Sequence, residues 1–109
     1  MHKVNIKPIS LNNAYVGRRF ASKTLKQYKS DISYLLPKIT VPEGKLSLML
    51  EFGVSYKSTD GDNLVKCFQD AIAEQYGFND KMIYKWSIEK VDVKRKEEYI
   101  KFKIDEYEK

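Results

Sequence analysis

The sequence predicts a small α+β protein in which two helices pack on a mixed β-sheet, in the order β-α-β-α-β-β. Apolar residues alternate over Leu46–Tyr56 and Ile100–Ile104, as in strands with one buried face. In two other segments they recur at three- and four-residue intervals, as in amphipathic helices. The length of 109 residues suits a single domain over residues 1–109.

The chain is expected to begin with a short strand and a polar loop. Val4 and Ile6 fall on one side of an extended segment over residues 1–8. Residues 10–19 are mostly polar and predict a loop before the first helix. The side chains of this loop are therefore expected at the surface.

A first helix is predicted from Ser22 to about Leu36. Ser22 is a suitable N-cap because its hydroxyl can accept from a free backbone N–H, and Pro37 stops the helix. Three lysines lie off the apolar face and are expected in solvent. The apolar face consists of Leu25, Tyr28, Ile32, Leu35 and Leu36.

The strict alternation over Leu46–Tyr56 is the strongest strand signal in the chain. Gly53 interrupts this run and is expected to mark a bend or bulge. A turn over residues 58–63 precedes a second helix, and Gly77 suits its C-terminal cap. The apolar stripe of this helix consists of Leu64, Cys67, Phe68, Ala71 and Ile72.

Two further strands are predicted near the C-terminus. The apolar alternation of the first shifts at Val91 and Val93, which predicts a bulge near Glu89–Lys90. Residues 94–97 are polar enough for a hairpin loop before the strand over Ile100–Ile104. The alternating residues of the first strand are Met82, Tyr84, Trp86 and Ile88.

Composition excludes several classes of protein. No stretch is apolar enough to span a membrane, and residues 1–8 lack a signal-peptide pattern, so a cytoplasmic protein is expected. The single Cys67 is expected in the core, and one Cys with one His cannot fill a structural zinc site. Twenty Lys and Arg against fifteen Asp and Glu give a net charge of +5, which favours an anionic partner such as nucleic acid.

Carboxylates gather at the turn before the second helix. Asp60 and Asp62 flank Gly61 at a strand-to-helix junction, where both can face one cavity. Asp80 follows that helix and can return to the same place if the strands before and after it are neighbours. Carboxylate oxygens suit Mg²⁺, and three of them can hold the ion against a phosphate for hydrolysis. An ordinary N-cap for Asp62 and an ordinary turn pair for Asp60-Gly61 remain open.

Lys66 lies one turn into the second helix, beside Asp62 on the helix surface. A cation near a helix N-terminus opposes the macrodipole, at a cost of roughly a few tenths of a kcal/mol. Neighbouring carboxylates or a bound phosphate would offset this cost. Lys66 can therefore stabilise charge on a reacting phosphate or protonate the leaving group. A solvated lysine on an exposed face is the alternative.

The polar loop near the N-terminus carries side chains that suit a DNA backbone. The guanidinium groups of Arg18 and Arg19 can each donate two hydrogen bonds to a phosphate. Asn12, Asn13 and Tyr15 offer further donors nearby. Most such contacts position DNA without reading its bases. A solvated surface loop is the alternative.

Tyr84 and Trp86 have two possible roles in the predicted third strand. Their rings can stack on unpaired bases. Their alternation with Met82 and Ile88 favours packing in the core or in a dimer interface.

The segments 60–66, 70–72 and 77–80 together resemble the signature of the RusA family. That signature reads Asp-x-Asp-Asn-x-x-Lys, then an Asp-Ala-Leu-like step, then a Gly followed by paired aspartates. Residues 8–15 also resemble the family's Pro-Pro-Ser-x-Asn opening. The departures from the pattern are Ile9, Gly61 and Asn79.

The resemblance implies a homodimeric Holliday-junction resolvase, an endodeoxyribonuclease that nicks two opposed strands of branched DNA in recombination and repair. It implies that Asp60, Asp62 and Asp80 bind Mg²⁺, with Mn²⁺ as a substitute, and that Lys66 is the essential lysine. It implies no small-molecule cofactor. Family members typically occur in bacteriophages and prophages, so a phage origin is also implied.

Two other functions stay open on the residues alone. A basic DNA-binding module without catalysis would keep Arg18 and Arg19 and use Asp60 and Asp62 only for the turn and the cap. An adaptor for a partner protein would show neither junction binding nor a salt-dependent affinity for DNA.

Overall fold

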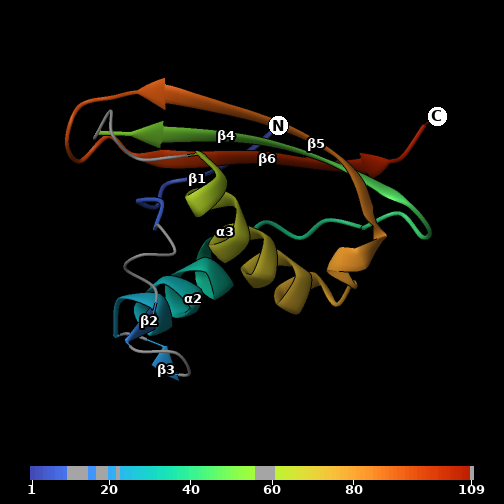
Figure 1. Cartoon of the computed structure of the whole chain (residues 1–109), viewed down its shortest axis with the longest axis horizontal. Coiled ribbons are helices and arrows are strands. Elements are labelled where there is room, and N and C mark those ends of the chain that lie inside the picture. Colours follow the sequence, from blue (N-terminus) through green and yellow to red (C-terminus); the bar gives the residue numbers. More distant parts are fainter. Residues whose placement is uncertain (10–14, 17–19, 22, 56–60, 109) are drawn as a thin grey trace.

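The computed structural model describes residues 1–9, 15–16, 20–21, 23–55 and 61–108, and for residues 15–16, 20–21 and 61–63 it describes the backbone alone. Two long helices lie on one face of a four-stranded sheet (Figure 1). The predicted α+β class and element order are thereby confirmed. The elements are β1 (His2–Val4), β2 (Tyr15–Val16), β3 (Phe20–Ala21), α2 (Lys23–Leu35), β4 (Leu46–Val54), α3 (Gly61–Tyr76), the 3₁₀ helix η1 (Asp80–Met82), β5 (Ile83–Asp92) and β6 (Tyr99–Glu106).

The sheet is mixed, with strands in the order β1-β6-β4-β5. Strands β4 and β5 are parallel and are joined by α3, as a parallel pair requires a crossover connection. Strand β6 runs antiparallel to both β4 and β1. Strands β2 and β3 form a separate two-stranded ribbon, which the sequence did not predict.

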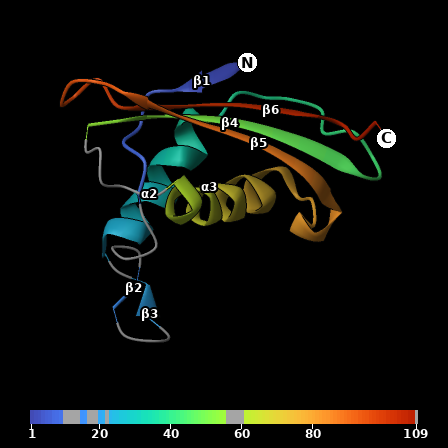
Figure 2. The ribbon, with the colours of Figure 1, turned by 45° about the horizontal axis from the view of Figure 1, so that its top comes forward.

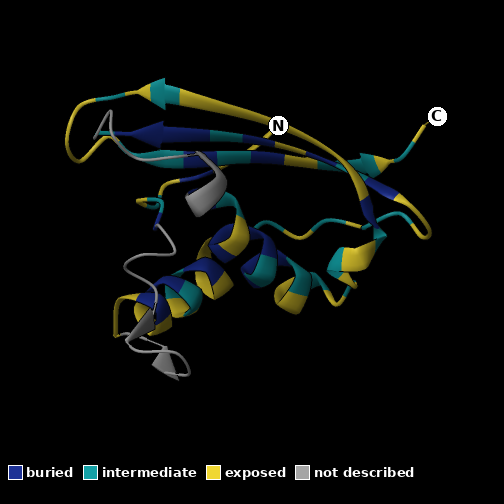
Figure 3. Ribbon diagram, viewed as in Figure 1, coloured by how far each residue is buried: buried dark blue, intermediate teal, exposed yellow. Residues whose placement is uncertain are grey.

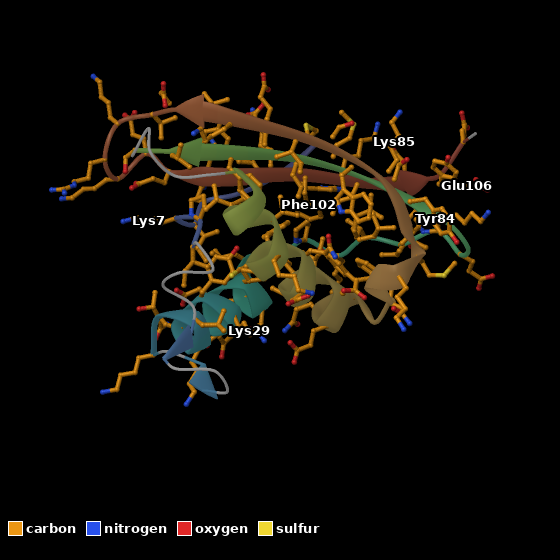
Figure 4. The ribbon with its side chains drawn as sticks, in the orientation of Figure 1. Lys7, Lys29, Tyr84, Lys85, Phe102 and Glu106 are labelled. Atoms are coloured by element: carbon orange, nitrogen blue, oxygen red, sulfur yellow. The ribbon has the colours of Figure 1, made fainter. Side chains whose placement is uncertain are left out.

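The core lies between the sheet and the two helices, as Figures 2 and 3 show. The alternating residues of β4 turn toward the helices and are almost completely buried. Phe68 of α3 packs against Phe102 of β6, with ring centroids 5.5 Å apart. Cys67 is buried in this core, as predicted. Figure 4 shows Phe102 on the helix side of the sheet and Lys85 on the opposite side.

Helix α3 ends where Gly77 adopts a φ of +71°, as its predicted cap role requires. The Gly77 N–H donates to the Ala73 carbonyl at 2.9 Å, and the Phe78 N–H donates to the same oxygen at 3.1 Å. The Tyr76 hydroxyl donates to the Pro37 carbonyl at 2.6 Å, which ties the end of α3 to the segment after α2. These bonds fix where the chain leaves α3 and turns toward η1.

Strand β5 differs from its prediction. Its register with β4 is irregular only between Leu46 and Ser47, where Tyr84 is the extra residue. The predicted bulge at Glu89–Lys90 is therefore wrong. As the edge strand, β5 buries only Ile83 fully, so apolar alternation did not mark one buried face.

Gly53 causes no bulge, because the register of β4 with β5 runs without a shift through it to Val54, and the register with β6 has no shift up to Gly53. A Cβ at this position would collide with the ring of Tyr99. The predicted bulge is therefore wrong, and this glycine makes room for an aromatic ring on the neighbouring strand.

The sequence predicted a hairpin loop at residues 94–97, and this prediction is wrong because β5 and β6 do not pair with each other. Residues 94–97 lead from β5 to β6, and these strands lie on either side of β4. The Val93 N–H donates to the Val54 carbonyl at 2.8 Å, so the connection crosses the end of β4. Among the helices of the described residues, none is long and apolar enough to cross a membrane.

Candidate active site

The strands before and after α3 are direct parallel neighbours, which is the condition set by the sequence for Asp80 to approach the start of α3. Helix α3 begins at Gly61, so Asp62 lies in its first turn. Asp60 and the side chain of Asp62 lie outside the described residues. Their convergence with Asp80 therefore stays a prediction.

Asp80 is held at the start of η1 by the residue before it. The Asn79 side chain accepts a hydrogen bond from the Lys81 N–H at 2.9 Å, and the Asn79 carbonyl accepts from the Met82 N–H at 3.0 Å. Asparagine and aspartate cap helices about equally well. The departure from paired aspartates at this position therefore keeps the cap and removes one charge beside Asp80.

Lys66 brings Asp80 and α3 together. Its Nζ lies 2.9 Å from Asp70 Oδ1 and 3.6 Å from Asp80 Oδ2. The side chains of Lys66, Asp70 and Asp80 are 50%, 32% and 36% exposed, so all three can reach solvent or a ligand. The hydrogen bond that Lys66 donates to Asp70, followed by the charges of Asp70 and Asp80, raises the pKa of Lys66 and keeps it protonated.

The contact between Lys66 and Asp80 places Asp80 close to the N-terminal part of α3. Four helical residues rise about 6 Å, so Lys66 lies one turn beyond Asp62. The carboxylate of Asp80 thus contacts the side chain of a residue one turn from Asp62. Among the residues whose side chains are described, no group of three His, Cys, Asp or Glu is placed to hold a metal ion. Asp80 and Asp70 are the carboxylates that the described part contributes near Lys66.

A protonated lysine between two half-exposed carboxylates can donate to an incoming phosphate oxygen. The carboxylates lower the electrostatic cost of holding that cation, and their exposure leaves them able to bind a divalent cation in turn. The arrangement therefore fits phosphoryl chemistry of the kind predicted from the sequence.

The profile of the RusA endodeoxyribonuclease family matches residues 5–104 of this 109-residue chain. The chain belongs to the RusA endodeoxyribonuclease family. The match begins directly after β1 and runs nearly to the end of β6, so both helices, β4, β5 and most of β6 lie within the RusA region. A search of curated proteins finds no match to the chain.

Within this RusA fold, Gln69 and Trp86 form a contact that the sequence did not predict. The Trp86 Nε1 donates to Gln69 Oε1 at 2.8 Å, and Gln69 is buried although it is polar. Trp86 is 45% exposed and Tyr84 is 52% exposed, so the core alternative for both is wrong. Base stacking and a dimer interface stay open as predictions for these rings.

The sequence argument also missed the contact between Asp70 and Lys66. Asp70 entered the sequence argument only through the RusA signature, without a role. The available signal was its spacing of four residues from Lys66, which places both side chains on one face of α3.

The predicted DNA-contacting loop cannot be placed in the same way. Asn12, Asn13, Arg18 and Arg19 lie outside the described residues, and for Tyr15 only the backbone, in β2, is described. Their contacts with DNA stay predictions.

A cavity of about 960 Å³ lies between residues 5–9, α2 and the end of β4. Ser55 and Leu64 both line it, and these residues stand on either side of the segment that holds Asp60. The cavity therefore reaches the residue after β4 and the first turn of α3. Its described charged residues balance one another and do not by themselves select an anion; they are Lys7, Lys23, Asp31 and Glu98.

Proposed function

We propose that this protein is a Mg²⁺-dependent endodeoxyribonuclease that resolves Holliday junctions by paired nicks, in DNA recombination and repair. The contact of Lys66 with Asp80, inside a RusA family domain, carries the proposal. It joins a cation suited to phosphate with a carboxylate suited to a divalent metal.

In the proposed mechanism, Asp60, Asp62 and Asp80 hold Mg²⁺, and Mn²⁺ can substitute. When bound, the ion supplies Lewis-acid chemistry to the scissile phosphodiester. Lys66 donates to a phosphate oxygen and offsets the negative charge that grows on the phosphate as the bond breaks. The Lys66 ammonium lies 3.6 Å from Asp80 Oδ2, so the lysine would stand beside the metal-binding carboxylate.

DNA is proposed to lie across α3 and the N-terminal loop. Arg18 and Arg19 would grip the phosphate backbone, and Asn12, Asn13 and Tyr15 would add donors. The net charge of +5 supports attraction to DNA.

Paired nicks in opposed strands require two active sites related by symmetry, so the protein is proposed to act as a homodimer. Each subunit would contribute one domain over residues 1–109 and no small-molecule cofactor. We place the enzyme in the bacterial cytoplasm, encoded by a phage or prophage.

The test is cleavage of a synthetic four-way junction by wild-type protein and Asp80→Asn. The variant keeps the shape of the side chain, so junction binding should persist while the nicking rate falls by at least about 100-fold. Asp105→Asn is the matched control, because it removes the same charge and an ion pair with Lys103 on β6. Its nicking rate should equal that of the wild type.

The competing function is a DNA-binding module without catalysis, which the net charge of +5 also supports. Wild-type protein that binds the junction yet never nicks it in Mg²⁺ or Mn²⁺ would establish this module and exclude the nuclease.

A further inference from the structure

We propose that Asp70 is a positioning residue that holds the Lys66 ammonium at the reaction site. The Lys66 Nζ lies closer to Asp70, at 2.9 Å, than to Asp80, at 3.6 Å. Asp70 itself is the least exposed of the three side chains. The inference rests on the proposed nuclease function and names a further residue needed for it.

Helix stability does not account for the Lys66–Asp70 pair. With the lysine N-terminal to its acid, the pair has the less favourable order for two residues four apart. Exposed pairs of this kind contribute little to folding in any case. An aspartate at this position is therefore better explained by what it does to Lys66 than by what it does to α3.

Asp70 can hold Lys66 under conditions in which Asp80 cannot. Asp80 lies on η1 and is proposed to share its charge with a divalent cation, which would weaken its attraction for the ammonium. Asp70 stands on the same helix as Lys66, so the α3 backbone fixes the distance between them. The Lys66–Asp70 contact therefore persists when Asp80 binds another partner.

A lysine side chain has many rotamers, and each one that points away from the phosphate is unproductive. Restricting it in advance leaves less freedom to be lost when the transition state forms. Asp70 supplies that restriction without touching DNA.

The primary experiment compares Asp70→Ala, Asp70→Asn and Asp70→Glu in junction cleavage. We expect Asp70→Ala to lower kcat by about 10-fold with little change in KM, because the ammonium is misplaced while DNA binding is retained. Asp70→Asn keeps an acceptor without the charge and should fall between Asp70→Ala and the wild type. Asp70→Glu should restore part of the rate.

Glu74→Ala is the matched control on the same helix. Glu74 lies one turn beyond Asp70 and pairs with Lys29 of α2 at 3.7 Å. This change also removes an exposed ion pair of α3, yet its kcat should equal that of the wild type. A loss as large as that of Asp70→Ala would overturn the proposal, because any exposed pair on α3 would then have the same effect.

A double-mutant cycle tests whether Asp70 acts through Lys66. Adding Asp70→Ala to Lys66→Met should cause no further loss of activity. A further loss equal to that in the wild-type background would show that Asp70 acts independently, and would overturn the proposal.

The second readout is the NMR order parameter of the Lys66 Nζ, measured without metal and without DNA. It should be higher in the wild type than in Asp70→Ala and unchanged in Glu74→Ala. Equal order in wild type and Asp70→Ala would overturn the positioning role. This measurement needs no cleavage, so it separates failure of the positioning role from failure of the proposed nuclease function.

Discussion

Helix α3 presents two faces to two different neighbours. The face toward the sheet is closed: Phe68 is fully buried, and its ring meets Phe52 at 6.5 Å and Phe102 at 5.5 Å between centroids. The face toward η1 is half open and carries Lys66 with Asp70. One helix thus anchors the fold on one side and presents charges on the other.

The difference shows how so small a fold can separate stability from chemistry. Close packing on the sheet side fixes the position and rotation of α3, because buried aromatic rings tolerate little displacement. The charged side chains on the other side, Lys66 and Asp70, then keep a fixed position relative to η1 without being buried. Changes on the closed face should therefore act on folding, and changes on the open face on activity.

The largest expected effect is on the closed face. Phe68→Ala should lower the free energy of unfolding by about 3–5 kcal/mol, because it leaves a cavity between α3 and the sheet. Lys66→Met on the open face should change it by less than about 0.5 kcal/mol. Urea unfolding followed by circular dichroism measures both values. Similar losses in the two variants would show that the two faces are not distinct.

The sequence could predict the closed face but only part of the open one. The apolar alternation of β4 predicted its buried face correctly, because strands pair with both of its edges and helices cover one face. Strand β5 has a neighbour on one side only, and Tyr84 is an extra residue in its register, so the core packing that the alternation favoured for its aromatic rings was wrong. The return of Asp80 toward the first turns of α3 was predicted on the assumption that the strands before and after the helix are neighbours, as β4 and β5 are.

The contact of Gln69 with Trp86 could not be predicted, because it depends on the exact register of β5 against β4. No local pattern encodes such a pair of residues on different elements. The Asn79 cap, in contrast, is a local interaction and could have been predicted from the Asn-Asp-Lys sequence.

A smaller loss of stability is expected when the Gln69–Trp86 hydrogen bond is removed. Trp86→Phe should lower the free energy of unfolding by about 1–2 kcal/mol, because the buried Gln69 amide loses its donor. Adding Gln69→Leu should recover part of this loss, since neither polar group is then left unpaired. Circular dichroism during urea unfolding is the measurement. Additive losses would show that the hydrogen bond does not couple the two residues.

The smallest expected effect lies on the sheet face that no helix covers. The Tyr99 hydroxyl donates to Glu51 Oε2 at 2.7 Å, and Lys101 lies 3.6 Å from the same oxygen. Tyr99→Phe should lower the free energy of unfolding by about 1 kcal/mol near neutral pH. Junction cleavage should be unchanged, because this network lies across the sheet from α3. A loss of cleavage in Tyr99→Phe would show that this network contributes to activity as well as to stability.

The pH dependence of that effect follows from the two pKa shifts. The hydrogen bond from Tyr99 is the main reason that the pKa of Glu51 lies below its usual 4.5. The stabilisation is therefore complete above pH 4.5 and is lost as the pH falls through the lower pKa of the folded protein. The same bond raises the pKa of Tyr99 to about 12, so the contribution is complete below the usual 10.0 and is lost only as the pH rises toward 12. The difference in unfolding free energy between wild type and Tyr99→Phe should thus be constant from about pH 6 to pH 9 and shrink in acid. A difference that stayed constant down to pH 3 would mean that the hydrogen bond does not depend on the charge of Glu51.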